Sequence, residues 1–118
     1  MKTKLPPTVE KYIQAVNAGD AEALQSTFAR DAVVKDVDRE IRGIDAIRRW
    51  ASHDIFGVQA SLEVRKVVER AGETTVTVKI DGTFSRKGLP DPLLMDHTFK
   101  IAGGEIATLI VRFTPAAE

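Results

Sequence analysis

The amino-acid sequence predicts one α+β domain in which the helices come first and most of the strands follow. Apolar residues near the start recur at intervals of three and four, the spacing that places them on one side of a helix. After Gly57, apolar and polar residues alternate, which is the period of a strand with one buried face. We therefore expect a curved, cone-shaped antiparallel sheet packed on three N-terminal helices, with an apolar pocket between the two layers.

Three helices are expected before Gly57. The first follows Pro6-Pro7, Asp20 is suited to cap the second, and Asp45 is suited to cap the third. The apolar residues that we expect to face the core are Val9, Tyr12, Ile13 and Val16 in the first helix, Leu24 and Phe28 in the second, and Ile47, Trp50 and Ala51 in the third.

The strands are predicted from their alternation and from the turns between them. A short strand at 32–34 leads into the strand-and-turn segment "KDVDREIRG", and the polar segment 85–92 is expected to be a loop. Four antiparallel strands are expected at 62–68, 74–80, 93–101 and 106–113. The last of them has apolar residues on both faces, so we expect it to be central, with helices on one side and the second subunit of a homodimer on the other.

Composition excludes several classes of function. The 118 residues suit a single domain, 1–118, and the 17 basic side chains are balanced by 17 acidic ones, which does not favour nucleic acid or an anionic membrane. The absence of cysteine excludes disulfides and a thiol nucleophile. No apolar signal core or bilayer-spanning segment is recognisable, so we expect a soluble cytoplasmic protein. The two histidines are too far apart in the sequence to suggest a metal site.

The segment "LLMDHTFKI" places an aspartate and a histidine side by side in an expected strand. Because neighbouring strand residues point to opposite faces, Asp96 and His97 cannot both face the core. Met95, His97 and Phe99 lie on the more apolar side, whereas Asp96 shares its side with Thr98 and Lys100. The alternation therefore favours His97 inward and Asp96 outward, and these two assignments are exclusive unless a bulge intervenes.

The motifs "KYIQAVNAGD", "FARDAVVKD", "RGIDAIRRW", "MDHTFKI" and "GGEI" resemble the nuclear transport factor 2-like superfamily, and within it the steroid Δ-isomerases and SnoaL-like polyketide cyclases. The resemblance covers nearly the whole chain and runs without a gap from Tyr12 to Asp36. It implies that Tyr12 takes the place of the oxyanion-hole tyrosine and Asp36 that of the general base. Asp96, or His97 if the strand is shifted, would take the place of the second donor of the isomerases. The resemblance also implies that Trp50, Phe28 and Phe99 line the ligand pocket.

These residue types suit proton transfer next to a carbonyl group. A carboxylate in a dry pocket can remove such a proton, while hydroxyl or imidazole donors stabilise the oxygen of the enolate. The sequence therefore predicts a small-molecule enzyme similar to ketosteroid isomerase, an isomerase or lyase that needs no cofactor and acts on an apolar carbonyl compound. A dehydratase, a cyclase or a hydrolase on the same fold is an alternative, and so is a domain that binds a small ligand without catalysis.

Each of these residues also has a purely structural interpretation. Tyr12 can be a core tyrosine on an apolar helix stripe, and His97 a buried histidine of the core or of a subunit interface. Asp36 can be a solvated carboxylate, since Asp38 and Glu40 are close to it in the sequence. An Asp36 that points into bulk water would argue against every acid–base interpretation.

Overall fold

A computed structural model of the chain describes residues 5–85 and 87–115. The helices and strands in this part are α1 (Pro7–Ala18), α2 (Ala21–Ser26), β1 (Phe28–Asp36), β2 (Arg39–Arg42), α3 (Ile44–Ala51), a π-helical turn η1 (Ser52–Phe56), β3 (Ser61–Arg70), β4 (Glu73–Asp81), β5 (Leu94–Ala102) and β6 (Glu105–Phe113). In the described part, no helix combines the length and the apolar character needed to cross a lipid bilayer.

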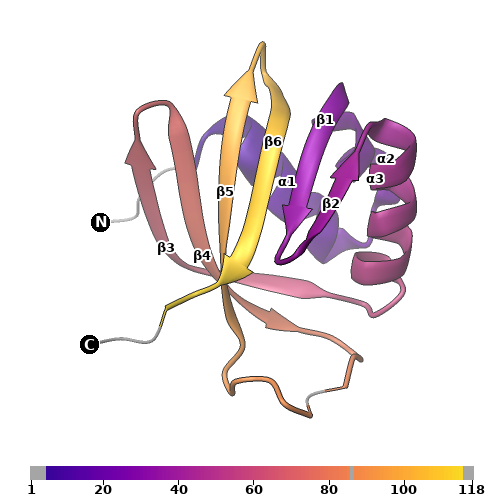
Figure 1. Ribbon diagram of the computed structural model, residues 1–118, viewed down its shortest axis with the longest axis vertical. Helices are drawn as coiled ribbons and strands as arrows, with labels where there is room; N and C mark the ends of the chain where they lie inside the picture. Colours follow the sequence, from indigo (N-terminus) through magenta and orange to yellow (C-terminus); the bar gives the residue numbers. More distant parts are fainter. Residues whose placement is uncertain (1–4, 86, 116–118) are drawn as a thin grey trace.

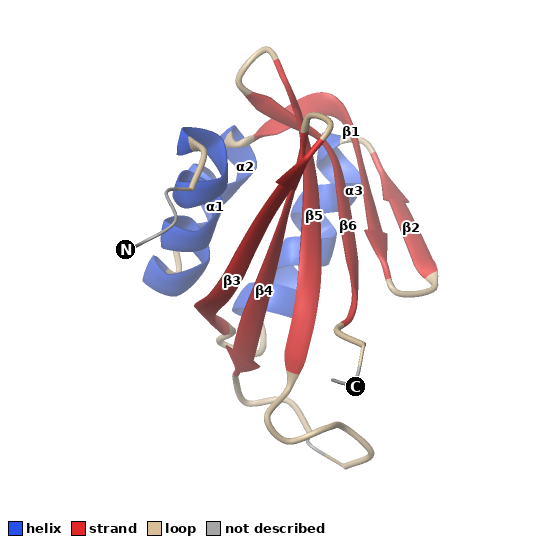
Figure 2. Cartoon of the chain, turned by 90° about the vertical axis from the view of Figure 1, so that its left-hand side faces the viewer, coloured by secondary structure: helices blue, strands red, loops and turns tan. Residues whose placement is uncertain are grey.

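The six strands form one curved sheet in the order β2-β1-β6-β5-β4-β3. All neighbouring strands are antiparallel except β1 and β6, which run parallel. The helices lie along one face of this sheet, so the predicted α+β class is confirmed (Figures 1 and 2). The prediction that 106–113 is a central strand is also confirmed, because β6 lies between β1 and β5.

The first two helices are joined by the turn that the sequence predicts. Gly19 adopts a left-handed conformation with φ of 69°, and its N–H bonds to carbonyl groups of the last turn of α1. Asp20 then caps α2, because its side chain accepts a hydrogen bond from the N–H of Ala23 at 3.0 Å. This tight connection holds α1 and α2 against the same side of the sheet, with Val9, Tyr12 and Leu24 fully buried.

Two expectations about helix ends were wrong. The second helix ends at Ser26, so Phe28 begins β1 instead of extending α2. The third helix begins at Ile44, and its N-cap is Gly43, whose φ of 86° is accessible mainly to glycine. Asp45 therefore lies in the first turn of α3, where its carboxylate is close to the positive end of the helix dipole.

The first strand is longer than expected. The sequence suggests a strand at 32–34, yet β1 extends from Phe28 to Asp36: it pairs with β6 at Phe28 and with both β2 and β6 from Val33 to Asp36. The hairpin that follows places Asp36 opposite Arg39. As a result, the chain turns directly after Asp36, at the end of β1, and continues in the same sheet as β2.

Candidate functional site

Three aromatic side chains surround Tyr12 beneath the sheet. The Tyr12 ring projects from α1 and meets Phe28 of β1 at 6.0 Å and Phe99 of β5 at 5.2 Å between ring centroids, both in edge-on geometry. The imidazole of His97, also on β5, lies 6.3 Å from the Tyr12 ring and is stacked on Phe99. The exposed fraction is 1% for Tyr12 and 5% for His97. The two polar groups are therefore enclosed in an apolar, aromatic interior.

Asp96 is not part of this cluster. It lies on the opposite face of the sheet, where its Oδ1 accepts hydrogen bonds from the hydroxyls of Thr77 and Thr114 at 2.7 and 2.8 Å. His97 instead shares the buried face of β5 with Met95 and Phe99. The inward position of His97 that the alternation favours is thus the one found, and Asp96 is separated from Tyr12 and Asp36.

Asp36 lies at the border between this interior and the solvent, and its side chain is 18% exposed. Its Oδ2 accepts a hydrogen bond from Trp50 Nε1 at 3.0 Å and another from Arg39 Nη2 at 2.6 Å. No described residue donates a hydrogen bond to the other oxygen, Oδ1. Asp36 is therefore a held carboxylate and not a side chain that points into bulk water.

The negative charge of Asp36 acts on both buried polar groups. The pKa of Tyr12 is raised, mainly because burial disfavours the phenolate and additionally because Asp36 is near. Burial lowers the pKa of His97 from 6.5 to about 4, against the opposing effects of Asp36, a backbone group of Met95 and Asp96. At neutral pH, Tyr12 and His97 are therefore both uncharged. His97 Nδ1 is buried without a hydrogen-bond partner among the described residues.

Arg39 connects Asp36 to a second carboxylate at the rim. The guanidinium group bonds to Asp36 and also to Asp54, which in turn contacts His53 Nδ1 at 2.7 Å. Burial tends to raise the pKa of Asp54, but the hydrogen bonds from His53 and Arg39 outweigh it, so this pKa is lowered overall. His53 is largely exposed and Asp54 is partly exposed, so this pair lies at the rim.

The sequence interpretation missed two partners of Asp36. Trp50 was expected to line a pocket, and its hydrogen bond to Asp36 was not foreseen. Arg39 was not considered, although a two-residue turn after Asp36 would have predicted that the two residues pair across a hairpin. Of the predicted pocket residues, Phe28 and Phe99 contact Tyr12, and Trp50 contacts Asp36.

Among the described residues, no group of three or more His, Asp or Glu side chains could hold a metal ion.

Comparison with known proteins identifies the family to which this fold belongs. A family model for the SnoaL-like domain matches residues 9–109. The chain therefore belongs to the SnoaL-like family of the nuclear transport factor 2-like superfamily, as the resemblance of the sequence implies.

Solved structures agree with this assignment. A proposed polyketide cyclase from Sinorhizobium meliloti, SMa1630, is 30% identical with a TM-score of 0.82, and the match covers 92% of this chain and 95% of that one. The Δ5-3-ketosteroid isomerase from a Mycobacterium species is similar in fold, with 17% identity, a TM-score of 0.72 and coverage of 91% and 90%. SalBIII, an epoxide hydrolase/cyclase-like enzyme with a role in pyran ring formation in polyether salinomycin, matches with 18% identity, a TM-score of 0.74 and coverage of 91% and 88%.

Proposed function

We propose that this protein removes and returns a proton next to the carbonyl group of a small apolar compound, with Asp36 as the base. The observation that carries the proposal is a single held carboxylate whose charge acts on two buried, neutral polar groups, Tyr12 and His97. Proton transfer to a carboxylate beside a carbonyl produces an enolate, and neutral donors can stabilise the enolate oxygen without adding charge.

The two hydrogen bonds on Asp36 assign different roles to its oxygens. Trp50 and Arg39 both donate to Oδ2, so this oxygen is fixed and partly neutralised. Oδ1 is then the oxygen that accepts the substrate proton. A base held in one orientation keeps its reactive oxygen in place, which lowers the entropic cost of reaching the transition state.

Tyr12 and His97 would stabilise the negative charge that develops on the substrate oxygen. The raised pKa of Tyr12 keeps its hydroxyl protonated, and the lowered pKa of His97 keeps its imidazole neutral at pH 7. A neutral imidazole can donate one hydrogen bond, and His97 Nδ1 has no described protein partner to compete with a ligand. The substrate carbonyl would point inward, with its reacting carbon toward Asp36.

The surroundings restrict the substrate to an apolar molecule that enters from the Asp36 side. Phe28 and Phe99 flank Tyr12, and Asp36 is the most exposed of the three polar groups. A charged compound would lose its hydration in this interior at a high free-energy cost. An apolar ketone or aldehyde avoids that cost and still offers an oxygen to the two donors.

The same residues support a second candidate function, a cyclase or dehydratase that begins with the same proton abstraction. Its support is the 30% identical proposed polyketide cyclase, a closer match in sequence than the isomerase. A hydrolase on the same fold and a binding domain without catalysis are the further alternatives.

As for assembly, we propose a homodimer through the outer face of the sheet, which analytical ultracentrifugation would test.

The first experiment is the ultraviolet assay for conversion of a β,γ-unsaturated steroid ketone to the conjugated enone. We expect turnover by the wild type and a loss of about a hundredfold or more in Asp36→Asn, since general-base catalysis contributes factors of this size. Asp54→Asn is the matched control, because Asp54 shares Arg39 with Asp36 but lies at the rim. Equal turnover in wild type and Asp36→Asn would refute the role of Asp36, whereas no turnover by the wild type would exclude steroid isomerisation and favour the alternatives.

A further inference from the structure

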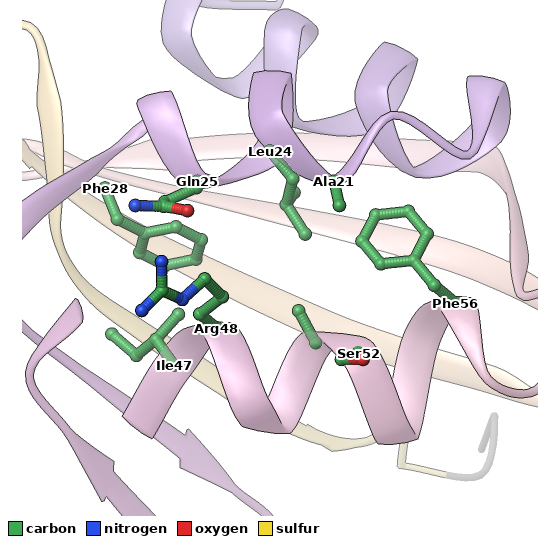
Figure 3. A pocket seen from close by; sticks show the side chains of 9 residues that line it. Ala21, Leu24, Gln25, Phe28, Ile47, Arg48, Ser52 and Phe56 are labelled. Carbon is green, nitrogen blue, oxygen red and sulfur yellow. The ribbon is translucent and has the colours of Figure 1, made fainter. Parts of the chain in front are cut away.

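A groove lies between α2 and α3, and it shares Phe28 with the surroundings of Tyr12. It has a volume of about 180 Å³ and is bounded by α2 on one side and by α3 and η1 on the other (Figure 3). None of Tyr12, Asp36 and His97 lines it. The groove is therefore a concave surface that the three polar groups of the proposed reaction do not line.

The volume of the groove suits one small ring. An apolar cavity of about 150 Å³ is large enough to hold a benzene molecule. The floor is formed by the buried side chains of Leu24 and Ile47, and aromatic rings lie at its two ends, Phe28 at one and Phe56 at the other (Figure 3). A planar six-membered ring or a short alkyl chain would cover this apolar surface.

The two long polar side chains of the groove are at the Phe28 end, whereas the hydroxyl of Ser52 lies toward Phe56 (Figure 3). Arg48 projects from α3 and Gln25 from α2, and the two side chains lie near each other at that end of the groove (Figure 3). Of the residues that line the groove, only Arg48 carries a charge. The ligand that complements this arrangement has an apolar body and an anionic end.

Arg48 retains hydrogen-bond donors for such an anion. Its partner in the structure is Asp45, one turn earlier in α3, at 3.2 Å, and both side chains are largely exposed. An exposed ion pair of this kind contributes little stability, and it occupies one of the five N–H donors of the guanidinium group. A carboxylate at the mouth of the groove could accept two parallel hydrogen bonds from the remaining donors.

We propose that the groove between α2 and α3 binds a small amphipathic carboxylate, with its ring or alkyl part on Leu24 and Ile47 and its carboxylate on Arg48 and Gln25. The inference goes beyond the proposed function and does not depend on it. An apolar carboxylate also differs in chemistry from the uncharged carbonyl compound proposed for the buried site.

The test is a titration of the ¹⁵N-labelled full chain with sodium phenylacetate, followed by amide chemical shifts. Saturable shifts are expected for groove residues such as Leu24 and Phe56. Arg48→Gln should weaken binding about fivefold, because an exposed charge-assisted pair is lost. Arg49→Gln, the exposed neighbour that does not line the groove, is the matched control and should bind as the wild type does. Phenylacetamide, which has the same ring without the charge, should bind more weakly than phenylacetate.

A third variant tests the location. Ala21 is an exposed residue at the mouth, so Ala21→Phe should fill the groove without disturbing the core and should abolish the shifts. Asp36→Asn should bind phenylacetate like the wild type, which separates this site from the proposed reaction. The proposal is overturned if the shifts do not saturate, if Arg49→Gln weakens binding as much as Arg48→Gln, or if phenylacetamide binds as tightly as phenylacetate.

Discussion

The buried imidazole of His97 should make the stability of this protein depend on pH below neutrality. The His97 side chain is enclosed by Tyr12 and Phe99, and its pKa falls from 6.5 to about 4 because burial disfavours the charged form. An unfolded chain binds this proton near pH 6.5, but the folded chain binds it only near pH 4. Between these values the unfolded state holds more protons, so acidification favours unfolding.

The size of the effect follows from the two pKa values. The contribution of neutral His97 to the free energy of unfolding is fully present above about pH 6.5. Below this pH it falls by about 1.4 kcal/mol for each unit of pH, until the folded state also binds the proton near pH 4. From about pH 7.5 to about pH 4.5, His97 alone should lower the free energy of unfolding by ~2.5 kcal/mol. A marginally stable domain would lose a large fraction of its stability by this change.

Urea denaturation at these two pH values measures the effect. For each protein, the free energy of unfolding at the lower pH is subtracted from that at the higher pH. This pH-dependent loss should be about 2.5 kcal/mol smaller in His97→Phe than in the wild type, because phenylalanine does not titrate. His53→Gln is the matched control, since His53 is the other histidine and is exposed, and it should keep the wild-type difference. If His97→Phe and the wild type respond identically to acidification, the inference that His97 is buried and neutral is refuted.

Three further predictions concern individual side chains. Trp50→Phe removes the hydrogen bond to Asp36, and we expect urea denaturation to show a loss of about 2 kcal/mol, while an unchanged stability would contradict the bond. Val37 has a φ of 59° and is 52% exposed, so Val37→Gly should raise the unfolding free energy by about 1 kcal/mol, whereas Val64→Gly, in β3 and without a positive φ, should lower it. Asp96→Ala should destabilise the protein by about 1–2 kcal/mol, because two threonine hydroxyls lose their acceptor, and leave kcat unchanged; a large loss of kcat would place Asp96 in the site.

The fold could be predicted because its periodic patterns are strong. The apolar stripe of the first helix and the alternation of the strands each repeat several times, and burial on one face explains both. The same alternation placed His97 inward, because Met95 and Phe99 share its side of β5. A pattern that extends over a whole strand thus predicted the face of the sheet to which a single side chain points.

Helix ends were predicted less well, because they depend on single residues. Asp45 and Gly43 are both plausible near the start of a helix, and the backbone conformation, which favours glycine, was decisive. Phe28 fits the spacing of α2, but pairing of the chain with β6 begins at that residue. Contacts with a strand almost eighty residues later in the chain cannot be seen in a local pattern.

The partners of Asp36 and the groove could also not be predicted from the sequence. Trp50 is fourteen residues from Asp36, and only the packing of α3 beside β1 brings its N–H to the carboxylate. The groove depends on the gap between α2 and α3, in which Gln25 and Arg48 come from different helices. Side chains meet there through tertiary structure, without a recognisable motif.

The central claim is that Asp36 removes a proton next to a carbonyl group, and deuterium exchange measures this step directly. Small apolar ketones are incubated with the protein in deuterated buffer, and deuterium at the carbon beside the carbonyl is measured by mass spectrometry. We predict catalysed exchange that falls about a hundredfold or more in Asp36→Asn and persists in Asp54→Asn. Exchange that is equal in the wild type and Asp36→Asn, or absent from the wild type with every ketone, would contradict the account.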